Sequence, residues 1–178
     1  MTKKSLLVLT DAVVVIKAHE QQCWNLLCNS YKIALPATIL EEEVFYFQAK
    51  GCKLGLMPSK WVSEGKVIRL EATINDHQDL SGKLSKHFMT GLDPGELESL
   101  ALLGSKEFKD SLFTTADKTA IKALGVLGWS ERGISVESLL VQAGGTGGIL
   151  KKLPQNCTKK WFDGCLQEGV AERHLWIK

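Results

Sequence analysis

Residues 5–16 read SLLVLTDAVVVI, and the interpretation of the whole chain starts from this stretch. Leu6 to Thr10 form a short apolar run without alternation, which is typical of a strand buried on both faces of a sheet. Asp11 then interrupts the apolar residues, and a helical pattern follows it. Because burying an unpaired carboxylate is costly, Asp11 either reaches the surface at the end of the strand or meets a positive charge. We expect it to surface and to wait there for a cation.

The composition is that of an ordinary globular protein. The chain has 178 residues, of which 44% are hydrophobic and 24% charged, and its length suits one domain. The formal net charge of +2 neither identifies nor excludes a nucleic-acid-binding protein, so any such site must be a local basic patch. The five cysteines lack CxxC spacing and the four histidines are scattered, which argues against a zinc site or a disulfide framework.

The sequence predicts a cytoplasmic protein that does not enter a membrane. No apolar run approaches the ~18 residues that a membrane-spanning helix needs. The start, MTKKSLLVLTD, is like a signal peptide, but Asp11 breaks its apolar segment and no small-residue cleavage site follows. The cysteine usage fits a reducing compartment.

Strands and helices are predicted to alternate along the chain. This order predicts an α/β fold, a three-layer α/β/α sandwich with a central parallel sheet. From Gly144 the pattern weakens, which divides the chain into a domain at 1–143 and a segment at 144–178. That segment is predicted to be a glycine-rich link followed by an amphipathic helix at 158–174, packed on the domain or on a partner. Strands are predicted at 6–10, 32–35, 66–72 and 111–117, with a last strand or strand-plus-turn at 134–142, and the main helices at 37–50, 75–87, 93–104 and 118–128.

Acidic residues recur where the predicted strands end and helices begin. Asp11 follows the first strand, Asp117 follows the strand LFTTA, and Glu96 lies in the first turn of the helix that Asp93 opens. A fourth acid, Glu42 or Glu43, lies one to two turns into the helix after Pro36. Because parallel strands all end at one edge of the sheet, we expect these carboxylates to converge.

Simpler roles exist for each of these acids taken singly. Asp11 and Asp117 suit helix N-caps, and Asp93 with Glu96 has capping-box spacing. The run 41–43 could be a solvated face, although helical phase places Glu43 on the buried stripe and Glu42 at its margin. Together, however, two carboxylates 4 Å apart repel by about 4 kcal/mol at an effective dielectric of 20. A divalent cation would relieve that repulsion, and oxygen ligands without His or Cys select Mg²⁺ or Mn²⁺.

Four motifs in order resemble a PIN domain over roughly residues 5 to 140. They are the apolar strand ending in Asp11, LPATILEE ending in Glu42, LDPGELESLALL, and LFTTAD ending in Asp117. The GELES form is similar to the branch of the family whose third motif is GE-x-E. The resemblance implies that 1–143 is a Mg²⁺- or Mn²⁺-dependent ribonuclease domain, of the kind found as the toxin of VapBC toxin–antitoxin pairs.

The resemblance also implies roles for individual residues. By motif position, the catalytic and metal-binding quartet would be Asp11, Glu42, Glu96 and Asp117. Glu43 and Glu98 are rivals to Glu42 and Glu96, and Thr115 matches the position of a supporting hydroxyl. An antitoxin protein and a second copy of the chain are the partners that the family implies.

The predicted reaction is metal-assisted hydrolysis of RNA, and the sequence offers two alternatives to it. Lys118 and Lys122 lie one turn apart after Asp117, where they could contact RNA phosphates or simply be solvated. One rival is a PIN-fold module that binds nucleic acid or a partner without catalysis. The other, a phosphatase with an aspartyl nucleophile, needs D-x-D after the first strand, where this chain has Asp11-Ala12-Val13.

Overall fold

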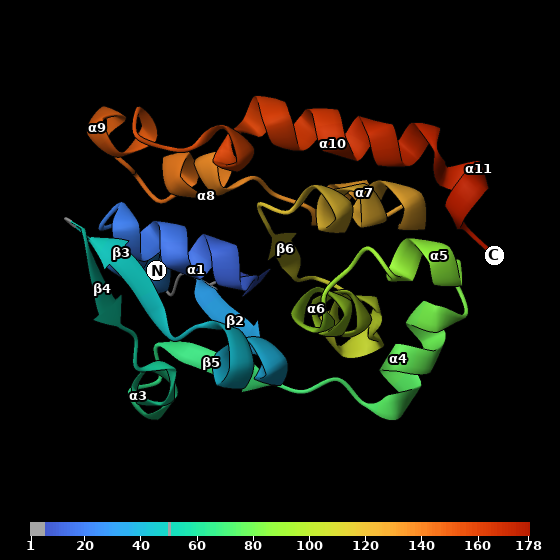
Figure 1. Cartoon of the computed structure of the whole chain (residues 1–178), viewed down its shortest axis with the longest axis horizontal. Helices are drawn as coiled ribbons and strands as arrows, with labels where there is room; N and C mark the ends of the chain where they lie inside the picture. Colours follow the sequence, from blue (N-terminus) through green and yellow to red (C-terminus); the bar gives the residue numbers. More distant parts are fainter. Residues whose placement is uncertain (1–5, 50) are drawn as a thin grey trace.

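A parallel four-stranded sheet forms the centre of the molecule (Figure 1). The computed structural model describes residues 6–49 and 51–178. Each strand of this sheet runs parallel to its neighbours, in the order β5-β2-β1-β6. The predicted central parallel sheet is therefore confirmed. Its strands are β1 (Leu7–Thr10), β2 (Lys32–Pro36), β5 (Val67–Leu70) and β6 (Leu112–Thr114).

Alternate residues of the strands supply two separate cores, one on each face of the sheet. Val8 and Ile33 are register partners and belong to one core, while Leu9, Ala34 and Phe113 belong to the other. Helices cover both faces, so the predicted three-layer α/β/α sandwich is confirmed. The first core is covered by α1 (Ala12–Glu20), α2 (Trp24–Ser30), α3 (Pro58–Ser63) and α8 (Val136–Gln142), and the second by α4 (Ile74–Ser81), α5 (Lys86–Met89), α6 (Pro94–Gly104), α7 (Lys118–Leu127) and α10 (Lys159–Ala171).

The predicted helix at 37–50 is wrong. Pro36 ends β2, and a single π-helical turn, η1 (Ile39–Glu43), follows. The chain then forms an antiparallel hairpin of β3 (Tyr46–Ala49) and β4 (Cys52–Gly55). The aromatic and β-branched residues at 44–47 prefer strands, and this preference outweighs the helical spacing of the apolar residues. Lys50, the last residue of the predicted helix, lies outside the described residues.

Two other predicted elements also differ from the structure. The predicted strand or strand-plus-turn at 134–142 is wrong, because most of this segment forms α8. The Ser135 hydroxyl accepts a hydrogen bond from the Ser138 amide at 3.1 Å and caps the helix. The predicted helix at 75–87 is divided into α4 and α5. Short helical turns complete this list of elements: η2 (Lys106–Phe108), η3 (Ser130–Arg132), α9 (Gly147–Leu150), η4 (Gln155–Cys157) and α11 (Arg173–Trp176).

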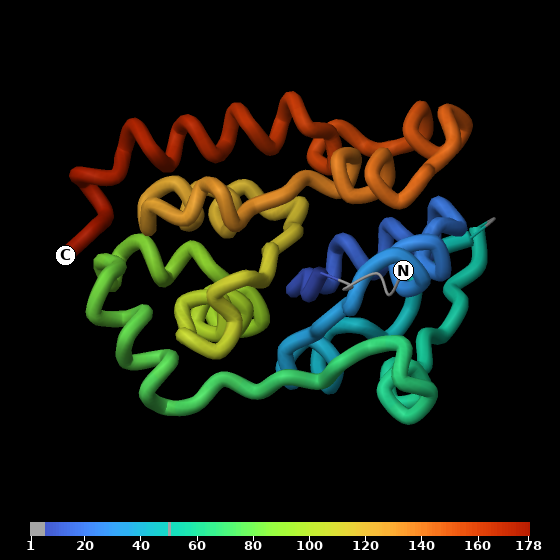
Figure 2. Tube along the Cα trace, turned by 180° about the vertical axis from the view of Figure 1, so that it is seen from behind, coloured from blue at the N-terminus to red at the C-terminus, as the bar shows by residue number. Residues whose placement is uncertain are grey.

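The C-terminal segment packs on the rest of the chain along α7. Figures 1 and 2 show α10 lying beside α7 from opposite sides of the molecule. The two helices meet at Gly125 and Gly169, where backbones touch. A Cβ atom at Gly125 would lie 2.7 Å from the Val170 nitrogen, and one at Gly169 would lie 2.9 Å from the Lys122 carbonyl carbon. The small residues therefore let α10 become part of the second core.

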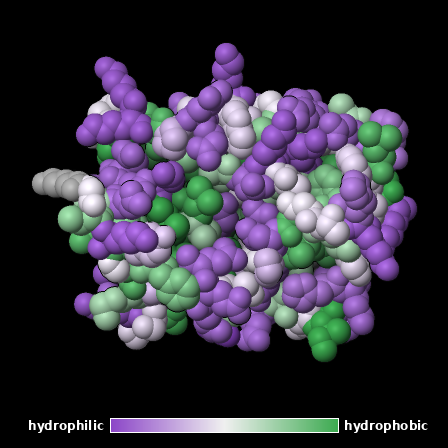
Figure 3. All heavy atoms as spheres, in the orientation of Figure 1, coloured by the Kyte–Doolittle hydropathy of each residue, from purple (hydrophilic) through white to green (hydrophobic). Residues whose placement is uncertain are grey.

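Apolar side chains are gathered mainly in the two cores. On the face drawn in Figure 3, apolar residues form small groups separated by hydrophilic ones. Within residues 6–49 and 51–178, no helix combines the length and the apolar character that crossing a membrane requires.

Candidate active site

Asp11 is buried where β1 passes into α1, with only 3% of its surface exposed. The expectation that it surfaces at the end of its strand is therefore wrong. Its Oδ1 accepts a hydrogen bond from the Val14 amide at 2.8 Å, and its Oδ2 accepts one from the Thr115 hydroxyl and one from the Ala116 amide at 3.3 Å. Burial nevertheless raises the pKa of Asp11 to about 6, because these bonds replace only part of the lost hydration.

Asp117 lies at the start of α7 and is joined to Asp11 through Thr115. Its Oδ1 accepts hydrogen bonds from the amides of Thr119 at 2.6 Å and Ala120 at 3.0 Å. The Thr115 hydroxyl accepts from the Asp117 amide at 3.0 Å while it donates to Asp11. The structure thus places Thr115 between the two acids, in the supporting position that the sequence motif predicts.

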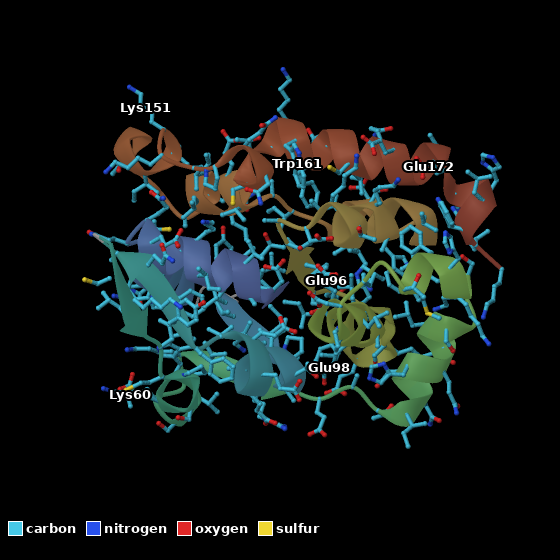
Figure 4. All side chains as sticks on the ribbon, in the orientation of Figure 1. Lys60, Glu96, Glu98, Lys151, Trp161 and Glu172 are labelled. Carbon is cyan, nitrogen blue, oxygen red and sulfur yellow. The ribbon has the colours of Figure 1, made fainter. Side chains whose placement is uncertain are left out.

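Glu96 is both a helix cap and a member of the acidic group. It forms a capping box with Asp93: Glu96 Oε2 accepts from the Asp93 amide at 3.0 Å, and Asp93 Oδ1 accepts from the Glu96 amide at 2.9 Å. Figure 4 shows Glu96 between α6 and β6. Burial, together with the charges of Asp117, Asp93 and Asp11, raises the pKa of Glu96 to about 8. Glu96 therefore caps α6 and also belongs to the acidic group.

The fourth acid of this group is Glu43 rather than Glu42. Glu42 is exposed, whereas Glu43 is half-buried and packs against α6 at Gly95. Burial raises the pKa of Glu43 to about 7, and the charges of Asp93 and Asp11 act in the same direction. A π-helical turn places one more residue in each turn than an α-helix, which changes the direction of successive side chains. Of the two rivals at this turn, Glu43 is therefore the one that lies with the other acids.

Glu98 has a structural role away from the other acids. Its two carboxylate oxygens accept hydrogen bonds from the Thr38 amide at 2.9 Å and the Ala72 amide at 3.1 Å. It therefore joins the start of η1 to the segment that follows β5. Its lower position on α6 in Figure 4 agrees with this role. Of the two rival acids on α6, Glu96 is the one that meets Asp11 and Asp117.

The two lysines predicted to contact RNA are engaged by α10. Lys118 forms an ion pair with Glu168 at 2.8 Å, and Lys122 pairs with Glu172 at 2.7 Å. The Lys122 side chain is only 17% exposed, so it serves the α7–α10 contact. Lys118 remains on the surface directly after Asp117. The structure thus leaves Lys118 accessible to a ligand and gives Lys122 a packing role.

The donor set of the site suits a hard divalent cation. Asp11, Glu43, Glu96 and Asp117 offer only carboxylate oxygens, the ligands that Mg²⁺ and Mn²⁺ prefer. The neighbouring Cys157 does not compete, since burial raises the pKa of its thiol to about 11. In the part of the chain that the structure describes, no three His, Cys, Asp or Glu side chains are already arranged as metal ligands. The acids form one electrostatic group, because their charges raise one another's pKa values. The carboxylates of Asp11, Glu96 and Asp117, however, accept hydrogen bonds at the starts of helices, as helix caps do.

Sequence reasoning missed the contribution of Asp93. Its charge raises the pKa of both Glu43 and Glu96, so it belongs to the same electrostatic group. The capping-box spacing of Asp93 and Glu96 was visible in the sequence, but it indicated only a helix start. Comparison of the sequence with protein-family models and with curated proteins finds no match. The likeness to PIN domains therefore rests on the motifs of this chain.

Proposed function

We propose that the chain is a Mg²⁺- or Mn²⁺-dependent ribonuclease with a PIN-like active site, which hydrolyses phosphodiester bonds of RNA. One observation supports this most: Asp11, Glu43, Glu96 and Asp117 come from four separate elements and lie in one acidic group. Asp11 and Glu96 are buried, and Glu43 and Asp117 are half-buried. Burial of several carboxylates in one place is unfavourable without a cation. A functional site is a common reason for such an arrangement.

The residues of the chain prepare this group for a cation. Backbone amides and the Thr115 hydroxyl orient the carboxylate of Asp11, and backbone amides orient that of Asp117, so both are held in place before any ligand arrives. Glu96, with a pKa of about 8, holds a proton at neutral pH, and a cation would displace that proton. When bound, the metal ion would lower the pKa of a water molecule and stabilise charge on the phosphate. Single-stranded RNA is the proposed substrate because its phosphates and bases are accessible.

A second candidate function has one observation in its favour. Asp11, Asp117 and Glu96 all accept hydrogen bonds at the starts of helices, so each has a structural role without a metal. A PIN-fold module that binds nucleic acid or a partner without catalysis would keep these caps. It would not gain stability from Mn²⁺. An antitoxin partner and a homodimer stay predictions of the family resemblance.

Thermal melting with and without Mn²⁺ tests the proposed site. We expect Mn²⁺ to raise the Tm of the native chain, because a ligand that binds only the folded state stabilises it. The double variant Asp11→Asn, Asp117→Asn should lose this rise. Asp79→Asn, an exposed acid on α4, is the matched control and should keep it. An unchanged Tm of the native chain in excess Mn²⁺ would contradict the proposal.

Digestion of a pooled RNA sample then separates a nuclease from a binding module. The native chain with Mn²⁺ should cleave the RNA, and EDTA or the double substitution should abolish cleavage. Cleavage that survives both substitutions would refute the assignment of these acids. Binding of RNA without any cleavage, together with an unchanged Tm in Mn²⁺, would favour the second candidate.

A further inference from the structure

A pocket with a volume of about 310 Å³ opens between the start of α7 and α10. An aromatic ring, two lysines and two uncharged polar side chains line it: Trp161, Lys118, Lys160, Gln155 and Thr158. Sites for small ligands occupy roughly 300–1,000 Å³, so the volume of this pocket suits a single small ligand. We propose that it binds one nucleotide of single-stranded RNA, with the base on Trp161 and a phosphate at Lys118 and Lys160. This inference rests on the proposed function and identifies where its substrate is held.

The pocket adjoins the acidic group through the backbone. Lys118, in its wall, is the residue directly after Asp117. On the opposite wall, η4 is tied to the same segment, since Asn156 Nδ2 donates a hydrogen bond to the Ala116 carbonyl at 3.3 Å. An RNA strand with one nucleotide in the pocket would therefore continue toward Asp117. This places a neighbouring phosphodiester at the edge where the acids meet.

Trp161 is positioned as a stacking surface for a base. It is half-buried, packs against the second core, and also lines the pocket. Its amide donates to the Thr158 hydroxyl at 3.3 Å, which fixes it in the first turn of α10. In Figure 4, Trp161 lies on α10 close to α7 and β6. Stacking on an aromatic ring accepts any base, so this contact would bind RNA without reading its sequence.

A phosphate can replace one partner of an ion pair at the pocket. The Lys118–Glu168 ion pair is exposed, at 53% and 46% of the two side chains, and exposed pairs contribute little to stability. A phosphate can therefore replace Glu168 as the partner of Lys118 at small cost. Lys160, on α10, also lines the pocket and is exposed. Glu168 also lines the pocket, so its negative charge opposes phosphate binding and sets its strength.

Binding of a short fluorescein-labelled single-stranded RNA of mixed sequence, measured by anisotropy in EDTA, tests this site. EDTA prevents metal-dependent cleavage, so only binding is measured. Trp161→Leu should weaken binding about tenfold or more through loss of stacking. Lys118→Ala and Lys160→Ala should each weaken it several-fold and reduce its salt dependence. Glu168→Gln should tighten binding.

Lys151→Ala is the matched control, because Lys151 is an exposed lysine next to α9 that does not line the pocket (Figure 4). It should bind like the native chain. If Trp161→Leu lowers the Tm strongly, the surface variants at Lys160 and Glu168 decide the question. No RNA binding by the native chain, or native-like binding by Trp161→Leu and Lys160→Ala, would overturn the proposal.

The outcomes distinguish this inference from the proposed function. If the native chain cleaves RNA with metal but the pocket variants bind RNA like the native chain, only the proposal that the pocket binds RNA is refuted. Loss of RNA binding in the pocket variants of a chain that never cleaves RNA would refute only the chemistry.

Discussion

The hydroxyl of Thr115 donates a hydrogen bond to the carboxylate of Asp11, which lies 104 positions away in the chain. The same hydroxyl accepts from the Asp117 amide at 3.0 Å. Because Asp11 follows β1 and Asp117 follows the neighbouring strand β6, one side chain links the two acids across adjacent strands. Substitution of Thr115 tests whether this link stabilises the site.

Thr115→Val removes the link while it keeps the shape of the side chain. We expect the free energy of unfolding to fall by about 1–3 kcal/mol, because the buried Asp11 carboxylate loses a hydrogen bond. The rise of Tm in Mn²⁺ should also become smaller. Urea unfolding measures the first effect, and thermal melting with and without Mn²⁺ measures the second.

Thr114→Val is the matched control for Thr115→Val. The Thr114 hydroxyl is buried, and within the described residues it has no hydrogen-bond partner. Replacing it by a methyl group should leave the free energy of unfolding unchanged or increase it. Equal losses in the two valine variants would contradict the role given to Thr115.

Gly95→Ala tests the close contact between α6 and η1. A Cβ atom at position 95 would lie 2.6 Å from Ile39 Cγ1 and would also meet the Glu43 carboxylate. We expect a loss of about 1–3 kcal/mol in the free energy of unfolding, as for other overpacked sites. The Mn²⁺ effect on Tm should weaken because Glu43 is displaced.

Gly164→Ala, on α10, is the control for Gly95→Ala. A Cβ atom there has no neighbour within 4 Å among the described residues. Alanine favours a helix interior over glycine by about 1 kcal/mol, so this variant should be more stable than the native chain. A stable, native-like Gly95→Ala variant would exclude the contact.

Glu96→Gln and Glu98→Gln separate the two buried acids of α6. Glu98→Gln should lower the free energy of unfolding by about 1–3 kcal/mol, because it weakens the hydrogen bonds from Thr38 and Ala72. It should keep the Tm rise in Mn²⁺. Glu96→Gln should have the opposite profile, with little loss of stability and loss of the Mn²⁺ effect. The same result for both variants would contradict the assignment.

Most of the sheet and of the acidic edge could be predicted from the sequence, since both depend on local signals. The apolar run before Asp11 and the LFTTA run before Asp117 are short and lack alternation, which favours buried strands. The fourth acid could not be assigned in this way. A π-helical turn is not visible in the spacing of apolar residues, and Glu42 and Glu43 can be told apart only by which one packs on Gly95.

The errors in secondary structure have a common physical cause. At 44–47 the apolar spacing predicts a helix, but the residues themselves prefer a strand, and pairing with β4 decides the outcome. At 134–142 the β-branched residues favour a strand, but the cap at Ser135 and packing on the first core produce α8. In both segments, tertiary contacts decided whether the helix or the strand formed.

His19 makes the first core sensitive to acid. Its ring lies 5.2 Å from the ring of Trp61 and 5.3 Å from that of Phe47, and burial lowers its pKa to about 4 from an ordinary 6.5. The folded state therefore binds this proton less well than the unfolded state. The stability that neutral His19 provides is present above pH 6.5 and is lost as the pH falls toward 4.

His19→Phe should reduce this loss because phenylalanine does not titrate. The difference between the free energies of unfolding at pH 7 and pH 4.5 should be smaller in the variant than in the native chain. The acids of the site also titrate in this range, but they are the same in both proteins and cancel in the comparison. His174→Phe, at an exposed position, should leave the difference unchanged. An unchanged difference in His19→Phe would exclude the effect.

The glycine contact between α7 and α10 has a kinetic consequence. Since backbone atoms touch at Gly125 and Gly169, the two helices cannot slide or tilt without separating. Lys118 and Trp161 lie on these helices, so the spacing of these two residues of the proposed RNA pocket is set before any ligand binds. RNA association should therefore be a single-step encounter, with an observed rate that increases linearly with RNA concentration and reaches no plateau.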